Sequence, residues 1–515
     1  MIKRCQGKLT AQPAVLLAGG LLLIGVVLRL LYLDKLPYGL NQDEASAGYD
    51  AWALLNSGID RNGKSWPVLF VSWGSGQNVL MSYLAMPFIA LMGLSPLSVR
   101  LPNALAGCVT LFVFWRLARR CRGESFGLLA LFLLVINPWH IMASRWGLES
   151  NLLPALLCGA CFFLSQVEET PKALLGVAVC LGLAPYAYGT VFFLLPPFLI
   201  WIVIRLRRSL KQEIVWASLL VFLVLIFPIA LCQALNVLGR EELKILGITF
   251  PRLIDVRQNS TSVLGGGGLG EIWKNFQIFL RILHNGDDGV EYNALPFWKG
   301  GIFYFFGLPL AVLGVIVSLC VRRERNEEWP MLALLGCSVL CAALIEGNIN
   351  RLNMAWIPMV YFCAVGGSWL TAQLRIRRAL PLAVVLISFC YFGYSYISGF
   401  APPGNEKYYP GLGETIIAAK ERSLETLYIT DQVREPYIYA LFYTTPQPER
   451  YLNSVECIVE PEAGMWTVKR FEGFEFEDPG KTELMILYRN DALEQGQNIL
   501  ETYGSFALCQ LQRQN

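Results

Sequence analysis

Long apolar stretches recur along most of this sequence and constrain its fold more than any other feature. A helix of about 20 apolar residues crosses the hydrocarbon core of a bilayer, and about eleven stretches approach or exceed that length. They lie at residues 12–33, 98–118, 124–143, 150–166, 172–188, 190–206, 213–236, 297–320, 329–347, 352–374 and 379–398. Hydrophobic residues make up 55% of the chain and charged residues 16%, whereas soluble globular chains carry about 25% charged residues. The sequence therefore predicts a mainly α protein, a polytopic membrane helix bundle, rather than a soluble enzyme or a disordered chain.

The distribution of lysine and arginine predicts how the bundle is oriented. These residues concentrate in alternate short loops, for example at Arg119-Arg120, Arg205-Leu206-Arg207 and Arg322-Arg323. Because positively charged loops stay in the cytoplasm, we expect a cytoplasmic N-terminus and, after an odd number of spans, an extracytoplasmic C-terminus. The net charge is only +3, so the sequence offers no global basic field and predicts no nucleic-acid partner.

The segments between and after the apolar stretches predict two domains. Residues 1–398 form a transmembrane module with two long outer loops, 34–97 and 237–296. In the second loop, aromatic and leucine side chains recur at helical spacing and predict an amphipathic helix in the membrane interface; they are Trp273, Phe276, Leu280 and Leu283. Residues 399–515 alternate short β-rich runs with helical patterns and predict a small extracytoplasmic α/β domain. Its expected strands are Leu427–Ile429, Leu484–Tyr488 and Phe506–Leu511, and its expected helices are Glu414–Glu425 and Ala492–Tyr503.

Histidine and cysteine usage argues against a metal centre built from those residues. The only histidines are His140 and His284, which excludes a multi-histidine site. Most cysteines lie inside apolar runs, where a thiol behaves as a small apolar side chain. Only Cys457 and Cys509 fall in the polar C-terminal segment. A disulfide between them and two free thiols are both compatible with the sequence.

An acidic pair follows the first apolar stretch, where Pro37 and Gly39 interrupt the helix. In the run Asn41-Gln42-Asp43-Glu44, Asn41 is placed to cap a new helix, and Glu44 stands where a capping-box carboxylate belongs. The alternative is a catalytic role for Asp43 and Glu44 at the bilayer surface. The two interpretations are compatible, because a capping partner also fixes the geometry of its neighbour.

Two further polar clusters fall on the same predicted side of the membrane. The first is Asn137-Pro138-Trp139-His140 followed by Arg145 and Glu149. Arg145 and Glu149 are four residues apart and are candidates for an ion pair on one helix face. The second is Glu346-Gly347-Asn348-Ile349-Asn350-Arg351. Arg351 is either an interfacial arginine that reaches towards water or a clamp on a phosphate oxygen.

The order of these motifs resembles a known family of membrane enzymes. Asp43-Glu44 is followed by Gly58-Ile59-Asp60, Trp66-Pro67, Ser98-Val99-Arg100-Leu101-Pro102 and Asn137-Pro138-Trp139-His140 with Arg145. This ordered set is similar to bacterial members of the dolichyl-phosphate-mannose protein mannosyltransferase and aminoarabinose transferase superfamily, membrane glycosyltransferases with the C-type fold. The resemblance covers about residues 10–400.

The resemblance implies a sugar donor carried on a polyprenyl phosphate and a first outer loop that forms the site. It implies that Asp43 acts as general base on the acceptor hydroxyl with support from Glu44, and that Arg145 and Arg351 hold the donor phosphate. Many relatives carry a Lys-Pro-Pro or His-Pro-Pro element late in this loop. This chain instead reads Gly76-Gln77-Asn78 there, so a cation expected near the phosphate is missing.

Three other residues are expected to support the site: Asp50, Glu149 and His140. No metal ligand is assigned. A divalent metal ion near Asp43 and Glu44 is compatible with the sequence but not required, because arginine alone can neutralise a lipid phosphate.

The sequence thus predicts an inverting glycosyltransferase of the plasma membrane. Its partners would be a polyprenyl-phosphate sugar donor, membrane lipid and an extracytoplasmic acceptor, which is a protein, a lipid or an envelope glycan. The alternative is a transporter or flippase for a lipid-linked or polar solute, although such proteins usually carry ionisable groups near the bilayer midplane. A third interpretation is a receptor or assembly protein whose C-terminal domain binds envelope components.

Overall fold

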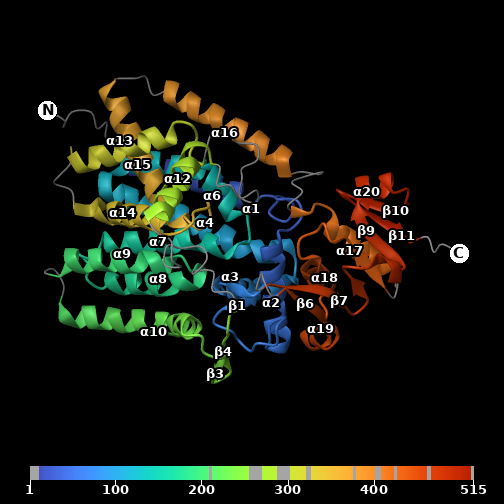
Figure 1. The fold of residues 1–515 in the computed structure, drawn as a ribbon. Helices are drawn as coiled ribbons and strands as arrows, with labels where there is room; N and C mark the ends of the chain where they lie inside the picture. The colour runs from blue at the N-terminus through green and yellow to red at the C-terminus, as the bar shows by residue number, and fades with distance from the viewer. Residues whose placement is uncertain are drawn as a thin grey trace.

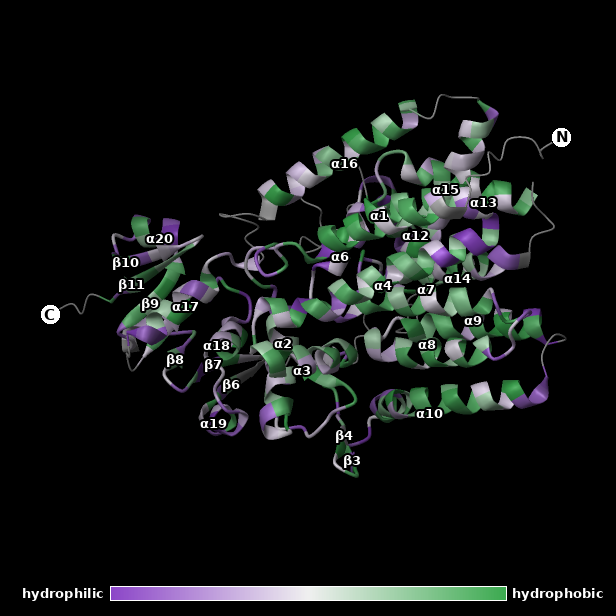
Figure 2. Cartoon of the chain, turned by 180° about the vertical axis from the view of Figure 1, so that it is seen from behind, coloured by the Kyte–Doolittle hydropathy of each residue, from purple (hydrophilic) through white to green (hydrophobic). Residues whose placement is uncertain are grey.

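Apolar helices packed side by side form most of the molecule, and a strand-rich region lies at one end of them (Figure 1). The computed structural model describes residues 11–207, 211–254, 269–286, 302–320, 326–374, 379–400, 408–422, 426–460 and 465–511. The helices are mostly apolar along their length, whereas the strand-rich end mixes polar and apolar residues (Figure 2). A polytopic bundle followed by an α/β segment, as predicted, is confirmed.

Each predicted apolar stretch contains helix wherever the structure describes it. The helices are α1 (Ala11–Leu30), α4 (Pro96–Arg122), α5 (Glu124–Val135), α6 (Pro138–Ser144), η1 (Glu149–Leu152), α7 (Leu153–Leu164), α8 (Ala173–Ala187), α9 (Val191–Leu206), α10 (Gln212–Val237), α13 (Gly307–Cys320), η3 (Asn326–Glu328), α14 (Trp329–Leu344), α15 (Asn353–Gln373) and α16 (Ala379–Phe400). The first residues of the predicted stretch 297–320 lie outside the described residues.

Five of these helices are long and apolar enough to cross a membrane within the described residues: α1, α4, α10, α15 and α16. Helices α5 and α6 qualify together but are bent by 62° at a short break. Pro138 explains the break, because a proline disfavours helical geometry in the preceding residue. That residue, Asn137, is extended, and its side chain accepts a hydrogen bond from the His140 backbone N–H at 3.0 Å. The remaining predicted spans form shorter apolar helices, so a total of eleven spans stays a prediction.

The first outer loop is an ordered layer between the bundle and the strand-rich end (Figure 1). It contains α2 (Gln42–Ser57), α3 (Leu80–Met92) and a two-stranded antiparallel sheet of β1 (Phe70–Ser72) and β2 (Ser75–Gln77). Asn41 and Glu44 form the predicted capping box at the start of α2. Gly58 ends α2 in a left-handed conformation with φ 71°, which glycine adopts without steric cost.

The second outer loop contains the predicted amphipathic helix, α12 (Leu269–Asn285), after a hairpin of β3 (Leu243–Ile245) and β4 (Ile248–Phe250). One face of α12 packs on α14 and buries Phe279 and Ile282, whereas Trp273 and Leu280 are exposed. The helix and its two-sided character are confirmed. Its location in the membrane interface stays a prediction.

We call residues 408–511 the C-terminal region. It contains a seven-stranded sheet in the order β10-β11-β9-β5-β8-β7-β6. The strands are β5 (Leu427–Ile429), β6 (Glu456–Glu460), β7 (Met465–Phe471), β8 (Phe474–Glu475), β9 (Leu484–Tyr488), β10 (Asn498–Tyr503) and β11 (Phe506–Gln510). The helical elements are α17 (Leu412–Glu421), α18 (Pro436–Thr444), α19 (Pro448–Ser454), η5 (Pro479–Lys481) and α20 (Arg489–Glu494).

Two expectations for the C-terminal region are resolved. The predicted helix Ala492–Tyr503 is wrong beyond Glu494, because Gly496 turns the chain with φ 64° and Asn498–Tyr503 pairs with β11 as strand β10. Cys457 and Cys509 are free thiols. They lie in β6 and β11, which are separated by four other strands of the sheet, so the structure favours the second of the two alternatives.

Candidate functional site

A cavity of about 400 Å³ opens where the first outer loop, the bundle and the C-terminal region meet. Its walls come from the start of α2, the β1–β2 hairpin, the turn between α6 and η1, the α8–α9 turn, the α14–α15 connection and the loop before α18. Its charged lining residues, among those that the structure describes, are two acids and two arginines: Asp43, Glu149, Arg351 and Arg434. The cavity thus combines carboxylates with guanidinium groups from separate parts of the fold.

Asp43 reaches the cavity from the first turn of α2. Its backbone N–H donates to the Asn41 side chain at 2.9 Å, and its carbonyl accepts from the Gln77 side chain at 3.3 Å. Asp43 is half-buried and lines the cavity. The capping interaction therefore fixes the backbone of the residue that the sequence predicts as general base.

A buried polar network holds the side chain of Gln77 in place. The side-chain Oε1 atom of Gln77 accepts hydrogen bonds from the hydroxyls of Ser46 and Ser72, each at 2.9 Å. Arg61 donates to both hydroxyls and forms an ion pair with Asp50 at 3.0 Å. Burial lowers the pKa of Arg61, but Asp50 raises it above its ordinary value. Asp50 lies outside the cavity lining and is connected to Asp43 through Arg61, the two serines and Gln77.

Glu44 is fully buried beneath Asp43 and also lies outside the cavity lining. Its carboxylate forms a two-pronged ion pair with Arg100, with N–O distances of 2.9 and 3.1 Å. The same carboxylate accepts from the backbone N–H groups of Asn41 at 3.1 Å and Gly147 at 2.8 Å. Glu44 thus connects the start of α2 to the Trp146–Leu148 wall of the cavity. It positions these segments and does not itself face the cavity.

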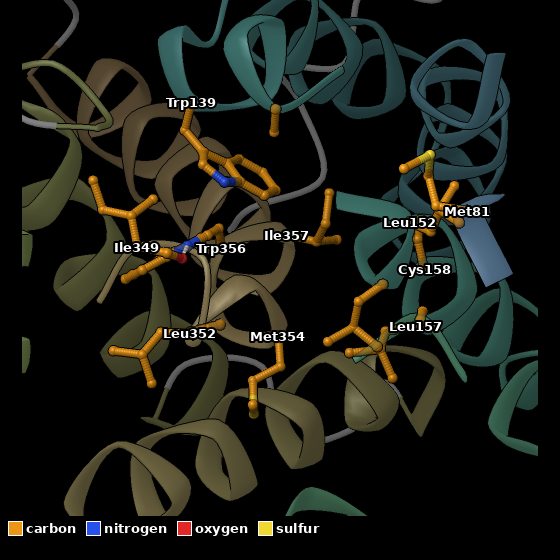
Figure 3. Close-up of a cluster of buried hydrophobic side chains, with 14 of the residues drawn as sticks. Met81, Trp139, Leu152, Leu157, Cys158, Ile349, Leu352, Met354, Trp356 and Ile357 are labelled. Atoms are coloured by element: carbon orange, nitrogen blue, oxygen red, sulfur yellow. Dashed lines mark hydrogen bonds between the residues drawn. The ribbon is translucent and has the colours of Figure 1, made fainter. Parts of the chain in front are cut away.

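Arg351 lines the cavity from the connection between α14 and α15. Its backbone N–H donates to the Asn348 side chain at 2.7 Å, and its guanidinium donates to the Glu346 carbonyl at 3.0 Å and carboxylate at 3.3 Å. The connection is anchored in the core, because the Trp356 indole donates to the Ile349 carbonyl at 2.9 Å. Figure 3 shows Ile349 and Trp356 gathered with Trp139 among buried apolar side chains.

Arg145 and Glu149 are placed differently from each other. Helix α6 ends at Ser144 and η1 begins at Glu149, so the two residues do not share one helix face as an i, i+4 pair requires. Arg145 is buried outside the cavity lining and donates to the carbonyls of Leu28, Tyr32 and Leu36. Glu149 is nearly buried and lines the cavity. Of the two arginines predicted to bind phosphate, only Arg351 reaches the cavity.

His140 is buried in α6 and lies outside the cavity lining. Its Nδ1 atom is 2.6 Å from a guanidinium nitrogen of Arg29, which also donates to the carbonyls of Leu134 and Val135. Because a guanidinium group can only donate, Nδ1 accepts. The structure thus places His140 in a link between α1 and the α5–α6 break, rather than with the residues that face the cavity.

Arg434 lines the cavity from the C-terminal region, and sequence reasoning did not single it out. No motif precedes it, and nearly 400 residues of sequence separate it from Asp43, so no local pattern connects the two. Gln77 and Asn78 also line the cavity. In the sequence, these two residues stand out only because their neutral amides occupy the place where the family resemblance predicts a cation.

Nothing in the described residues groups three or more histidine, cysteine, aspartate or glutamate side chains as a metal site requires. Asp43 and Glu149 are the carboxylates that the cavity offers among those residues. The site can therefore supply a carboxylate to take up a proton and guanidinium groups to bind an anion. The surrounding wall adds aromatic and amide side chains, including Trp73, Trp146 and Tyr188.

Comparisons with known proteins relate both the sequence and the fold to membrane glycosyltransferases. Residues 75–231 match the sequence model of the dolichyl-phosphate-mannose-protein mannosyltransferase family. YycA of Bacillus subtilis (strain 168), whose given name proposes a mannosyltransferase, is 30% identical over 158 residues, which is 29% of this chain and 22% of YycA. The chain thus aligns with less than a quarter of that relative's length.

Two solved structures share the fold at low sequence identity. ArnT from Cupriavidus metallidurans, solved with undecaprenyl phosphate, is 13% identical with a TM-score of 0.58, and the match covers 97% of this chain and 98% of ArnT. The oligosaccharyltransferase AglB from Archaeoglobus fulgidus is 14% identical with a TM-score of 0.51, covering 84% of this chain and 64% of AglB. The chain is a multi-pass membrane protein with the fold of the C-type glycosyltransferases, the superfamily that its motifs resemble.

Proposed function

We propose that this protein is a membrane glycosyltransferase that moves a sugar from a polyprenyl-phosphate-linked donor to an extracytoplasmic acceptor. The observation that carries the proposal is one cavity, at the end of an apolar helix bundle, lined by both Asp43 and Arg351. A carboxylate and a guanidinium group are the two functions that this transfer requires. The fold shared with ArnT, which was solved with undecaprenyl phosphate, supports a lipid-borne donor.

In the proposed step, the acceptor hydroxyl attacks the anomeric carbon of the sugar while the bond from that carbon to the phosphate oxygen breaks. The phosphate leaves with the bonding electron pair, and the hydroxyl proton passes to Asp43. Arg351 neutralises the leaving phosphate, so no acid is needed at that oxygen. General-base assistance of this kind is typically worth about 10²–10⁴-fold in rate. A single displacement from the face opposite the phosphate inverts the anomeric centre.

The other candidate residues have supporting roles in this proposal. Glu44 and Asp50 position Asp43, through Arg100 and through the Arg61–Gln77 network respectively. Glu149 faces the same cavity and is a second carboxylate near the substrates. Arg145 and His140 hold the bundle together beneath the site, and the proposal gives them no contact with the donor. The predicted topology places the cavity on the extracytoplasmic side of the plasma membrane.

The test combines a deletion strain with matched carboxylate variants. Polyprenyl-phosphate sugars that accumulate in the deletion strain are identified by mass spectrometry, and the strain is complemented with wild-type protein, Asp43→Asn or Asp34→Asn. Asp34 is an exposed acid of the same loop outside the described cavity lining. We expect the wild type and Asp34→Asn to clear the donor, and Asp43→Asn to leave it accumulated at a normal protein level.

Two results would contradict the proposal. Full clearance by Asp43→Asn would reject Asp43 as the base. A deletion strain with an unchanged profile of lipid-linked sugars would reject the donor class. Substrate counterflow in proteoliposomes without any glycosidic product would instead favour the transporter alternative.

A further inference from the structure

The loop between β5 and α18 presents Arg434 to the cavity on a well-anchored backbone. The Arg434 N–H donates to the Tyr409 hydroxyl at 2.9 Å. The preceding residue, Val433, is fully buried, and its N–H donates to the Thr430 carbonyl at 3.2 Å. The backbone is therefore held at Arg434 itself and at the residue before it, while the Arg434 side chain is exposed.

The residue after Arg434 has an unfavourable backbone conformation. Glu435 adopts left-handed values, with φ 53° and ψ 57°, although it is not glycine. Such a conformation costs about 1–3 kcal/mol and persists only where the surroundings determine it. The Glu435 side chain is buried and α18 begins directly after it, so this turn connects the cavity-lining Arg434 to the helix.

The first outer loop brings no positive charge to the cavity among the described residues. Where a cation was expected, Gln77 and Asn78 line the wall with neutral amides. Any described positive charge in the cavity lining therefore comes from Arg351 or Arg434. These arginines belong to different parts of the fold: Arg351 lies on the helix bundle and Arg434 on the C-terminal region.

Arg351 by itself is incompletely suited to hold a phosphate group. It shares an ion pair with Glu346 at 3.3 Å, and 53% of the Glu346 side chain is exposed. Exposed ion pairs are weak, so a phosphate can replace this carboxylate, but one guanidinium group satisfies only one edge of a phosphate. Guanidinium groups bind phosphate oxygens through paired, charge-assisted hydrogen bonds. Arg434 is a second guanidinium group that faces the same cavity.

We propose that Arg434 is a phosphate-binding residue, so that the C-terminal region completes the anion site that Arg351 begins on the helix bundle. This inference rests on the proposed function for the identity of the phosphate carrier, which is either the lipid-linked donor or a phosphate-bearing acceptor. It assigns the C-terminal region a direct part in substrate binding. The phosphate site is then complete only when the C-terminal region is packed against the helix bundle.

Binding of defined probes to the purified full-length protein tests this inference without any knowledge of the sugar. The probes are a polyprenyl phosphate, the polyprenol of equal chain length, and a water-soluble sugar phosphate. The variants are Arg434→Gln, Arg434→Lys and Arg351→Gln. Arg450→Gln is the matched control, because Arg450 is an exposed arginine of α19 outside the described cavity lining. Thermal unfolding of each variant verifies that the protein is folded.

We expect Arg434→Gln to weaken phosphate binding by about 10–100-fold, the usual range for loss of a hydrogen bond to a charged group. Arg434→Lys should restore part of the affinity, since it keeps the charge without the planar fork. Arg450→Gln should bind as the wild type does, and polyprenol should bind all variants equally. If Arg434→Gln weakens binding of polyprenyl phosphate alone, Arg434 binds the phosphate of the donor. If it weakens binding of the sugar phosphate alone, Arg434 binds the phosphate of the acceptor.

Equal affinity of Arg434→Gln and the wild type for both phosphate probes would overturn the inference. An equal loss of polyprenol binding would also overturn it, because the effect would then be independent of phosphate. These results differ from failure of the proposed function, which is measured by sugar transfer with Asp43→Asn. Wild-type protein that binds no phosphate probe would overturn both proposals.

Discussion

Glu44 and Arg100 form a fully buried ion pair that joins α2 to α4, with both guanidinium–carboxylate contacts between 2.9 and 3.1 Å. Arg100 also donates to the carbonyls of Leu33, Pro37 and Gly39. A single guanidinium group thus holds the chain between α1 and α2 in place. Because Asp43 is adjacent to Glu44, the pair determines where the proposed base lies.

Replacing Glu44 with glutamine should destabilise the protein strongly. Loss of one partner leaves the Arg100 charge buried without compensation, which typically costs about 3–5 kcal/mol. Thermal unfolding of the purified protein in detergent measures the effect. Glu501→Gln is the control, since Glu501 pairs with Arg422 at the surface and its loss should leave the melting temperature unchanged. Equal melting temperatures for Glu44→Gln and the wild type would show that the pair is dispensable.

Arg145 and Arg351 should respond differently to the same substitution. Arg145→Gln removes the donor to three carbonyls, one in the last turn of α1 and two in the segment that follows it. Each unsatisfied buried group costs about 1–3 kcal/mol. This variant should melt earlier. Arg351→Gln affects a half-buried side chain, so it should melt normally but bind polyprenyl phosphate more weakly. Measuring both properties on both variants separates structure from binding, and the reverse pattern would contradict the assignment.

Gly39→Ala should loosen the contact between the first outer loop and the C-terminal region. Gly39 has φ +87°, and an added Cβ would lie 1.9 Å from the Tyr408 carbonyl oxygen. Gly63→Ala is the control: it has a similar φ of +72°, but its Cβ would meet only a leucine methyl group at 3.3 Å. Hydrogen exchange of residues 408–422 should increase for Gly39→Ala alone. Similar exchange in both variants would attribute the effect to backbone strain rather than to the contact.

Stability should decrease as the pH rises from about 4.5 to about 7. Burial raises the pKa of Glu435 from 4.5 to about 7, although Arg434 and Arg61 oppose the shift. The folded protein therefore binds more protons than the unfolded chain in this window, and the free energy of unfolding falls with increasing pH. Above about pH 7 this contribution is constant.

Glu435→Gln should remove the contribution of Glu435 to this pH dependence. That contribution to the free energy of unfolding is on the order of 1–3 kcal/mol between pH 4.5 and 7. Burial also raises the pKa of Asp60 to about 7, with Asp50 adding to the shift, so part of the slope should persist in the variant. Denaturant unfolding at several pH values measures both curves. An identical slope in Glu435→Gln and the wild type would place the titration elsewhere.

The elements that local pattern predicts are those whose cause is local. The apolar stretches predict helices because a helix satisfies its backbone hydrogen bonds within itself, as a segment in a bilayer must. Helix α2 begins where Asn41 and Glu44 form its capping box. The amphipathic helix α12 follows from the spacing of its aromatic residues. The predicted helix at Ala492–Tyr503 is wrong beyond Glu494, because the chain turns at Gly496 and then pairs with β11 as a strand.

The sequence by itself determined the membrane bundle and the capped start of α2, and its resemblance to a glycosyltransferase superfamily made Asp43 the leading candidate for the base. Only the tertiary structure decided which charged residues share the cavity with Asp43. Arg145 and Arg351 are both arginines near helix ends in the sequence. In the structure, Arg145 donates to backbone carbonyls, whereas Arg351 lines the cavity. Arg434 lines the same cavity, although nearly 400 residues of sequence separate it from Asp43. The physical reason is that helix formation depends on neighbours in the chain, whereas the partners of a charged side chain depend on which distant segments fold against it.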